Sequence, residues 1–267
     1  MGKISRSQDL ATHFKRESTI MPHPAFQYVA HRPWPLPAAH WTSAQIWHDL
    51  LFAHWPLPPE NLRLFIPPEL PLDTFDGNAW VGVVPFWMSG IRRRGLPPIP
   101  GLSSFPELNV RTYVTLQGKP GVYFFSLDAA NRPAVWAARR FFHLPYFHAQ
   151  MKSQPIGETI HYQSTRTGAS SAEFRGKFKP TSSIRLRTPG TLDHWFTERY
   201  CLYTTFAGNI YRGDIHHQQW PLQDAEAEIE VNTMAEASGI TLPNSPPVLH
   251  FARKLEVAIW PLSRVQL

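Results

Sequence analysis

The 267-residue sequence has little cysteine and no long apolar run. Its one cysteine, Cys201, excludes an intramolecular disulfide and a cysteine-based zinc cluster, and it fits a reducing compartment. The N-terminus lacks the continuous apolar core of a signal peptide. The longest apolar stretch, residues 79–91, is too short to span a bilayer and contains Pro85. We therefore expect a cytoplasmic protein that does not insert into membranes.

Several local signatures of catalysis are also missing. The sequence has no phosphate-cradling glycine loop, no paired-glycine dinucleotide turn, no HExxH zinc helix and no nucleophile elbow. These absences disfavour nucleotide hydrolases, Rossmann oxidoreductases and α/β-hydrolases. Thirteen histidines are present, but His143 and His148 are separated by a proline, and the neighbours His216 and His217 would point to opposite sides of a strand. Neither a metal nor another cofactor is predicted.

What the sequence does contain is enough apolar material for a sizeable core. The apolar fraction is 43% and the aromatic fraction is 13%, far above the level of disordered chains. Residues 1–40 are polar, basic and then proline-rich, which predicts an extended N-terminal arm. Aromatic residues and leucine then recur without a linker, so residues 41–267 are expected to form one domain.

Strand patterns dominate the expected domain. They cover residues 79–86, 108–116, 122–127, 159–166, 184–187, 200–206, 210–216, 225–231, 248–252 and 255–260. Residues 117–121 and 207–209 are typical of hairpin loops, so the sheet should be largely antiparallel. Two helices are predicted between strands. One starts near Pro133 and ends near His143, and the other follows a possible N-cap at Thr191. The predicted fold class is mainly β, a β-rich α+β protein.

The segment from Phe105 to Val114 has two interpretations. Strand alternation puts Leu108 and Val110 on one face, and Glu107, Asn109 and Arg111 on the other. The polar face is either the solvated outside of an ordinary antiparallel strand or the lining of a pocket. Glu107 and Arg111 would be about 13 Å apart at ~3.4 Å per residue, so direct neutralisation of one by the other is not expected. Each then needs another partner or a ligand.

Two other features favour structural roles. Cys201 is expected to be a buried small hydrophobe and not a catalytic thiol. Arg175, Lys177 and Lys179 alternate with Phe174, Gly176 and Phe178, which is typical of a solvated strand face. The net charge of +6 permits nucleic-acid binding, but this would require the basic residues of the arm and of this strip to lie on one surface.

Several segments together resemble the YqjF-like family, a branch of the acetoacetate decarboxylase-like superfamily. They follow the family order between Trp41 and Leu262, and they are residues 52–55 (FAHW), 76–80 (DGNAW), 84–86 (VPF), 105–113 (FPELNVRTY), 123–128 (YFFSLD), 137–139 (AAR), 144–146 (LPY), 198–200 (ERY) and 217–223 (HQQWPLQ). The resemblance implies a mainly antiparallel, barrel- or cone-like β fold around an interior pocket, with a few outer helices. It also favours the pocket interpretation of Glu107, because the decarboxylases carry an active-site glutamate in the comparable strand.

The resemblance also implies that one essential group is missing. In the decarboxylases the nucleophilic lysine belongs to a proline-lysine-lysine segment that follows a helix. Here Tyr146 and Phe147 occupy the places of the two lysines, and a phenol cannot form an imine. Lys152 is the only lysine near the expected site, and it is not favoured as a nucleophile, since a Schiff-base lysine must be kept neutral by desolvation or a neighbouring cation.

The leading hypothesis is a pocket protein that binds a small anionic organic molecule, with Arg111 or Arg139 clamping a carboxylate. Whether it is an enzyme stays open; if it is one, Glu107 and Tyr146 are the candidates for acid/base chemistry of a lyase or isomerase type that needs no Schiff base. The candidate ligand-binding residues are Asn109, Arg111, Arg139, His54 and Tyr203, and Glu198 with Arg199 is a possible structural pair. The alternative is a non-catalytic binding or scaffold module. The expected partner is the small molecule, with nucleic acid disfavoured and homo-oligomer formation left open.

Overall fold

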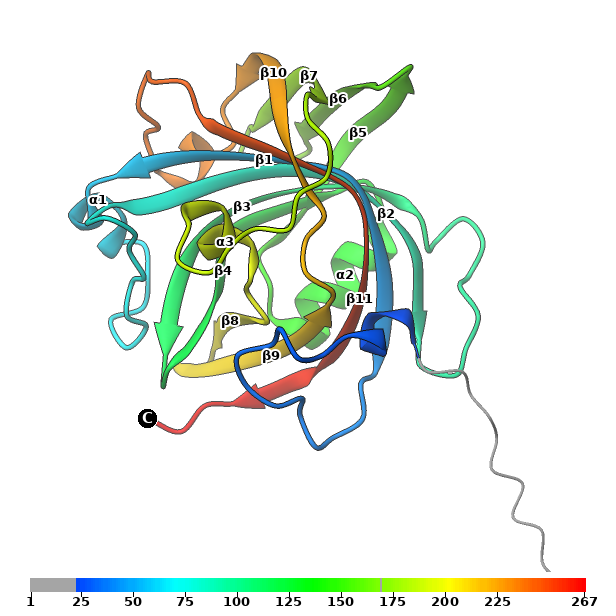
Figure 1. Ribbon diagram of the computed structural model, residues 1–267, viewed down its shortest axis with the longest axis vertical. Coiled ribbons are helices and arrows are strands. Elements are labelled where there is room, and N and C mark those ends of the chain that lie inside the picture. The colour runs from blue at the N-terminus through cyan, green and yellow to red at the C-terminus, as the bar shows by residue number, and fades with distance from the viewer. Residues whose placement is uncertain (1–22, 169) are drawn as a thin grey trace, which may run out of the picture.

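The computed structural model describes residues 23–168 and 170–267 (Figure 1). The strands are β1 (Ser43–Leu57), β2 (Ala79–Arg93), β3 (Phe105–Leu116), β4 (Lys119–Ala129), β5 (Tyr146–Ile156), β6 (Thr159–Arg166), β7 (Glu173–Pro180), β8 (Cys201–Phe206), β9 (Asn209–His217), β10 (Leu222–Asn232) and β11 (Val248–Arg264). The helices are α1 (Pro59–Arg63), α2 (Arg132–Phe142) and α3 (Leu192–Thr197), with the short 3₁₀ helices η1 (Pro24–Gln27) and η2 (Glu236–Ser238). The prediction of a mainly β protein is confirmed.

All eleven strands belong to one sheet, which closes into a ring. Strand β1, at one end of the strand order, pairs with both β2 and β11, and β8, at the other end, pairs back with β4. The sheet branches at β4, which pairs with β3, β5 and β8, and again at β11, which pairs with β1, β9 and β10. The β4–β5 and β4–β8 pairings are parallel and the other named pairings are antiparallel. The prediction of a largely antiparallel sheet is therefore confirmed.

Side-chain alternation gives the long strands two buried faces. In β1, Leu51 belongs to one apolar cluster and Phe52 to another. In β3, Leu108 and Val110 join the first cluster with the aromatic residues of β6 and β7. The polar residues of β3 lie on the opposite face, which looks into the ring crossed by α3 (Figure 1). The alternation expected for this strand is confirmed.

Both predicted helices form, and local chemistry explains their ends. At the start of α2, the side chain of Asn131 accepts a hydrogen bond from the backbone N–H of Ala134 at 3.0 Å, and Pro133 lies in the first turn. The helix ends where His143 adopts a left-handed conformation with φ 50°. Helix α3 follows Thr191, whose hydroxyl accepts from the backbone N–H of His194 at 3.5 Å.

Some sequence expectations differ from the structure. Residues 184–187, predicted as a strand, form only an isolated bridge between Arg185 and Leu222. The two short strands expected at 248–252 and 255–260 are one continuous strand, β11. Strand β1 was not anticipated, because its period is broken by register shifts and by Asp49, which has φ 50°.

Part of the N-terminal arm lies outside the described residues, and the rest packs on the domain. From residue 23 onward the arm crosses β9 and β11 (Figure 1). Ala25 is buried against Ala258 and Trp260, and Arg32 forms an ion pair with Asp214 at 3.2 Å. Arg32, which is one of the basic residues of the arm, is therefore a buried structural cation.

Candidate functional site

Strand β3 carries three polar side chains that face the interior of the ring. Glu107 is 3% exposed, Asn109 is 4% exposed and Arg111 is 9% exposed. They lie in the middle of the sheet, because β3 is hydrogen-bonded to β2 on one edge and β4 on the other. Burial of such groups is costly unless each finds a partner, so their contacts decide what the site can do.

Glu107 and Tyr146 form a hydrogen-bonded pair. The Tyr146 hydroxyl donates to Oε2 of Glu107 at 2.7 Å, and it comes from the first residue of β5, beyond helix α2. Burial raises the pKa of Glu107 to about 8, although the hydrogen bond from Tyr146 opposes the shift. Burial and the nearby Glu107 raise the pKa of the Tyr146 phenol. Glu107 is therefore a neutral carboxylic acid at pH 7, and it can donate a proton.

Arg111 is a buried cation without an acidic partner among the described residues. Its guanidinium carbon lies 5.3 Å from the ring centroid of Phe52 and 5.9 Å from that of Tyr113. Its Nε has no hydrogen-bond partner in the described part of the chain. The guanidinium therefore packs against two aromatic rings, and the Tyr113 side chain is also its polar neighbour.

His54 lies beside Arg111 and is kept neutral. Its Nε2 is 2.6 Å from the Tyr113 hydroxyl, and its ring stacks on Phe196 of α3 with centroids 3.8 Å apart. Burial and then the charge of Arg111 lower the pKa of His54. A side chain at Gly82 would lie 2.8 Å from His54 Nε2, so glycine is what lets β2 approach this cluster.

Further buried polar atoms near this cluster lack hydrogen-bond partners within the described residues. They are His54 Nδ1, Asn109 Oδ1, Trp80 Nε1 and Trp220 Nε1. The rings of Phe52 and Trp220 pack edge to face at 4.9 Å, so Trp220 lies next to the ring on which the Arg111 guanidinium packs. Because most buried polar groups in native proteins are satisfied, such a group of unpaired donors and acceptors is typical of a binding site.

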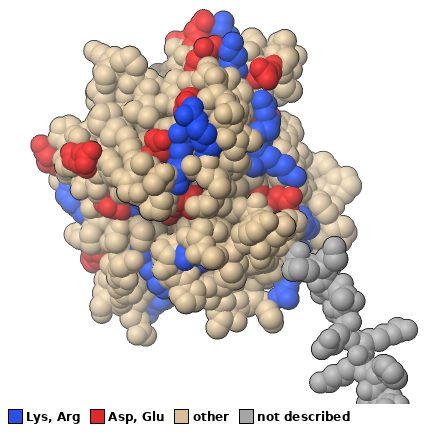
Figure 2. Space-filling model, in the orientation of Figure 1, with Lys and Arg blue, Asp and Glu red and all other residues tan. Residues whose placement is uncertain are grey.

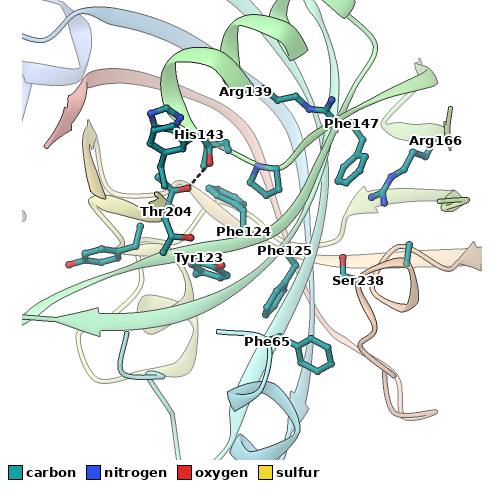
Figure 3. Close-up of a pocket in the computed structure, with 16 residues that line it drawn as sticks. Phe65, Tyr123, Phe124, Phe125, Arg139, His143, Phe147, Arg166, Thr204 and Ser238 are labelled. Atoms are coloured by element: carbon teal, nitrogen blue, oxygen red, sulfur yellow. Dashed lines mark hydrogen bonds between the residues drawn. The ribbon is translucent and has the colours of Figure 1, made fainter. Parts of the chain in front are cut away.

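Two of the other candidates, Arg139 and Tyr203, line a different cavity (Figure 3). This cavity has a volume of about 560 Å³ and lies where β4, β5 and β8 diverge. Arg139 is linked to the first site only through the main chain, because its Nε donates to the carbonyl oxygen of Tyr146 at 2.5 Å. The structure thus brings Glu107 to Tyr146 and Arg111 to His54, and it puts Arg139 and Tyr203 outside that interior group.

The charged residues Glu198 and Arg199 have separate partners. Arg199 Nη1 pairs with Asp73 at 2.5 Å, and its guanidinium carbon lies 4.3 Å from the Trp195 ring centroid. Glu198 accepts hydrogen bonds from the Tyr200 hydroxyl and, at 3.4 Å, from the backbone N–H of Trp220. Each residue therefore has its own partners, and the pair considered from the sequence does not form between them in the described structure.

A further ion pair, between Asp128 and Arg166, was not predicted from the sequence. Nε and Nη2 of Arg166 each donate to one carboxylate oxygen of Asp128 at 2.7 Å, and both side chains are buried. Burial raises the pKa of Asp128, and Arg166 opposes this effect. The residues are 38 positions apart and no local motif connects them, so only the tertiary fold identifies the pair.

The remaining candidates have ordinary environments. Cys201 is fully buried, and burial raises the pKa of its thiol to about 12, which disfavours a thiolate at neutral pH. Arg175, Lys177 and Lys179 of β7 each pair with a glutamate of β10, and Figure 2 shows acidic and basic side chains side by side at that end of the molecule. These pairs neutralise the basic strip.

Two features are absent from residues 23–168 and 170–267. No group of three or more histidine, cysteine, aspartate or glutamate side chains is placed to hold a metal ion within these ranges. Likewise, none of the helices in them has the length and apolar character needed to cross a membrane.

The fold defines the class of protein. Acetoacetate decarboxylase from Legionella pneumophila aligns with a TM-score of 0.63 at 11% identity, over 89% of this chain and 93% of that one. The enduracididine biosynthesis enzyme MppR, solved in complex with pyruvate, aligns with a TM-score of 0.59 at 10% identity, over 86% of this chain and 92% of that one. At these identities the likeness shows the fold alone, which is that of acetoacetate decarboxylase.

Sequence comparison then gives the family. The family model DUF2071, described as "Uncharacterized conserved protein", matches residues 44–256, and the chain belongs to this family. A relative in Bacillus subtilis (strain 168), "Uncharacterized protein YqjF", is 52% identical over 229 residues, which cover 86% of this chain and 95% of the relative. The resemblance drawn from the sequence motifs is confirmed.

Proposed function

We propose that this protein binds a small organic anion in the interior of its sheet, with the ligand carboxylate paired to Arg111. The observation that carries the proposal is the buried guanidinium of Arg111, which has no acidic partner among the described residues. An unpaired buried charge is strongly destabilising, whereas a carboxylate ligand would supply two oxygens in the geometry that a guanidinium prefers. The neutral state of His54 and the protonated state of Glu107 leave Arg111 as the cation of this group.

The proposed ligand is a small oxo acid. Solved proteins of the same fold are named for acetoacetate or were solved with pyruvate, so these two acids are the first probes. Asn109 and His54 would contribute hydrogen bonds to the non-ionised part of the ligand, because each carries a buried polar atom without a partner in the described chain.

Acid/base chemistry is the reaction type that fits the proposed ligand. Residue 146 cannot form a lysine-dependent imine with the ligand, because its side chain is the phenol of tyrosine and not an amine. Glu107, protonated at neutral pH, would act as a general acid, and Tyr146 would orient it through the 2.7 Å hydrogen bond. Enolisation of an oxo acid also requires a base for the α-proton. The neutral His54, whose Nδ1 has no partner in the described chain, would accept that proton while Glu107 protonates the carbonyl oxygen.

The test measures binding and folding separately. Titration calorimetry with pyruvate and acetoacetate is compared for the wild type, Arg111→Ala and Arg253→Ala, while urea unfolding measures the stability of each variant. Arg253 is a matched control, since it is an exposed arginine paired with Asp49 on the outside of β11. Arg111→Ala should weaken binding by about a hundredfold, the worth of a charge-assisted bidentate contact, and Arg253→Ala should not change it.

The second candidate function, a scaffold without a ligand, makes the opposite prediction. It requires Arg111 to stabilise the ring through Phe52 and Tyr113. Arg111→Ala would then lower the free energy of unfolding and leave the affinity of each folded molecule for the acids unchanged. This outcome, or the absence of binding by either acid to the wild type, would refute the proposal as stated.

A further inference from the structure

A second candidate binding site is the cavity between β4, β5 and β8, on the other side of β5 from the Tyr146 hydroxyl. Its volume of about 560 Å³ is within the range of small-molecule sites. Figure 3 shows Arg139 and Arg166 near Phe147, with Phe124, Phe125 and Tyr123 forming the inner wall. Neither Glu107 nor Arg111 lines it.

The branching of the sheet creates this cavity. Strand β4 pairs with β8 at residues 122–123 and with β5 at residues 127–129, so residues 124–126 have a strand partner only in β3 among the described strands. A bulge opposite Val110 and Arg111 falls at the same place, and Phe124 and Phe125 both line the gap. The gap is therefore a property of the topology, and two adjacent aromatic rings line it.

The walls are aromatic and the cationic groups are concentrated at one end. Phe147 lies between two guanidinium groups, with its ring centroid 3.9 Å from the Arg166 carbon and 5.4 Å from the Arg139 carbon. Arg166 is held by its bidentate pair with Asp128, which leaves Nη1 without a partner in the described chain. Arg139 has no acidic partner in the same ranges, and only its Nε is used, by the carbonyl oxygen of Tyr146.

We infer that this cavity is a binding site for an aromatic carboxylate, distinct from the interior site at Arg111. The carboxylate pairs with Arg139 and accepts a hydrogen bond from Arg166, while the aromatic ring of the ligand lies against Phe124, Phe125 and Phe147. An anion is favoured over a neutral ligand because Arg139, which is exposed at this end of the cavity, has guanidinium donors that no acidic side chain of the described chain occupies. An aromatic body is favoured because offset and edge-to-face packing suits this wall.

The experiment uses 2-naphthoate as the probe and its neutral amide, 2-naphthamide, as the matched ligand. Titration calorimetry on the full chain should give binding of 2-naphthoate at least about tenfold tighter than that of 2-naphthamide, the worth of one charge-assisted contact. Arg139→Gln should remove this preference. Arg140→Gln is the control, because Arg140 is the next residue of α2, is also exposed and does not line the cavity.

Two further variants locate the probe. Ser238→Trp adds a large side chain to the lining from the partly exposed helix η2, and it should abolish binding of 2-naphthoate while the protein stays folded. Arg111→Ala should leave 2-naphthoate binding unchanged. If Arg111→Ala abolishes binding and Arg139→Gln does not, the probe occupies the interior site and the inference is wrong. Equal affinity of the acid and the amide would also overturn it.

Discussion

The titration of Glu107 makes the sharpest prediction about this protein. The carboxyl is 3% exposed, and burial raises its pKa from 4.5 to about 8. The folded state therefore holds a proton that the unfolded state releases above pH 4.5. Stability from such a group is fully present below the unfolded pKa and is lost as the pH rises to the folded pKa. At about 1.4 kcal/mol per pH unit, the loss between pH 5 and pH 8 is about 4 kcal/mol.

The variant Glu107→Gln isolates this contribution. Glutamine keeps the acceptor for the Tyr146 hydroxyl and never ionises. The difference in the free energy of unfolding, variant minus wild type, should therefore rise between pH 5 and pH 8 and then become constant. Buried histidines such as His54 and His217, whose pKa values are lowered, titrate in both proteins and cancel in the difference. The measurement is urea unfolding at each pH unit from 5 to 9.

A control shows whether the effect belongs to the interior site. Glu226→Gln removes an exposed glutamate of β10 that pairs with Lys179 of β7. The free energy of unfolding of this variant should stay within about 0.5 kcal/mol of the wild-type value at every pH, because exposed ion pairs contribute little. A flat difference for Glu107→Gln, or one that falls as the pH rises, would mean that Glu107 is ionised in the folded protein. Its role as a proton donor would then be untenable.

Three other predictions concern the same region. Gly82→Ala should destabilise the protein by about 1–3 kcal/mol in urea unfolding, because the new methyl group meets the ring of His54 at 2.8 Å. Asp128→Asn should cost about 3–5 kcal/mol in the same assay, since it leaves the buried Arg166 charge uncompensated; a loss below 1 kcal/mol would contradict this. Borohydride reduction with acetoacetate should leave the protein mass unchanged, whereas an adduct on Lys152 would show that an imine forms.

Sequence reasoning predicted those features that depend on neighbouring residues. The alternation of residues along β3 predicted that Glu107 and Arg111 share one face of the strand. The helix N-caps at Asn131 and Thr191 likewise lie at residues whose side chains commonly accept such hydrogen bonds. The branching of the sheet at β4 could not be predicted, because β4 meets β8 about 80 residues later and the pairing covers two residues. The separation of Arg139 from the interior group follows from that branching, so it was equally inaccessible from spacing.

The spacing along β3 limits how the interior site would work. The α-carbons of Glu107 and Arg111 are about 13 Å apart at ~3.4 Å per residue, with Asn109 between them on the same face. A ligand whose carboxylate is held by Arg111 therefore reaches the Glu107 carboxyl only if the rest of the ligand extends past Asn109. The Oδ1 atom of Asn109 has no partner in the described structure. In a lysine-dependent decarboxylase the imine supplies the positive charge at the reacting carbon. Here residue 146 is a tyrosine, which forms no imine and supplies no such charge. A neutral Glu107 and the fixed cation of Arg111 would therefore have to stabilise an enolate from the two ends of the ligand.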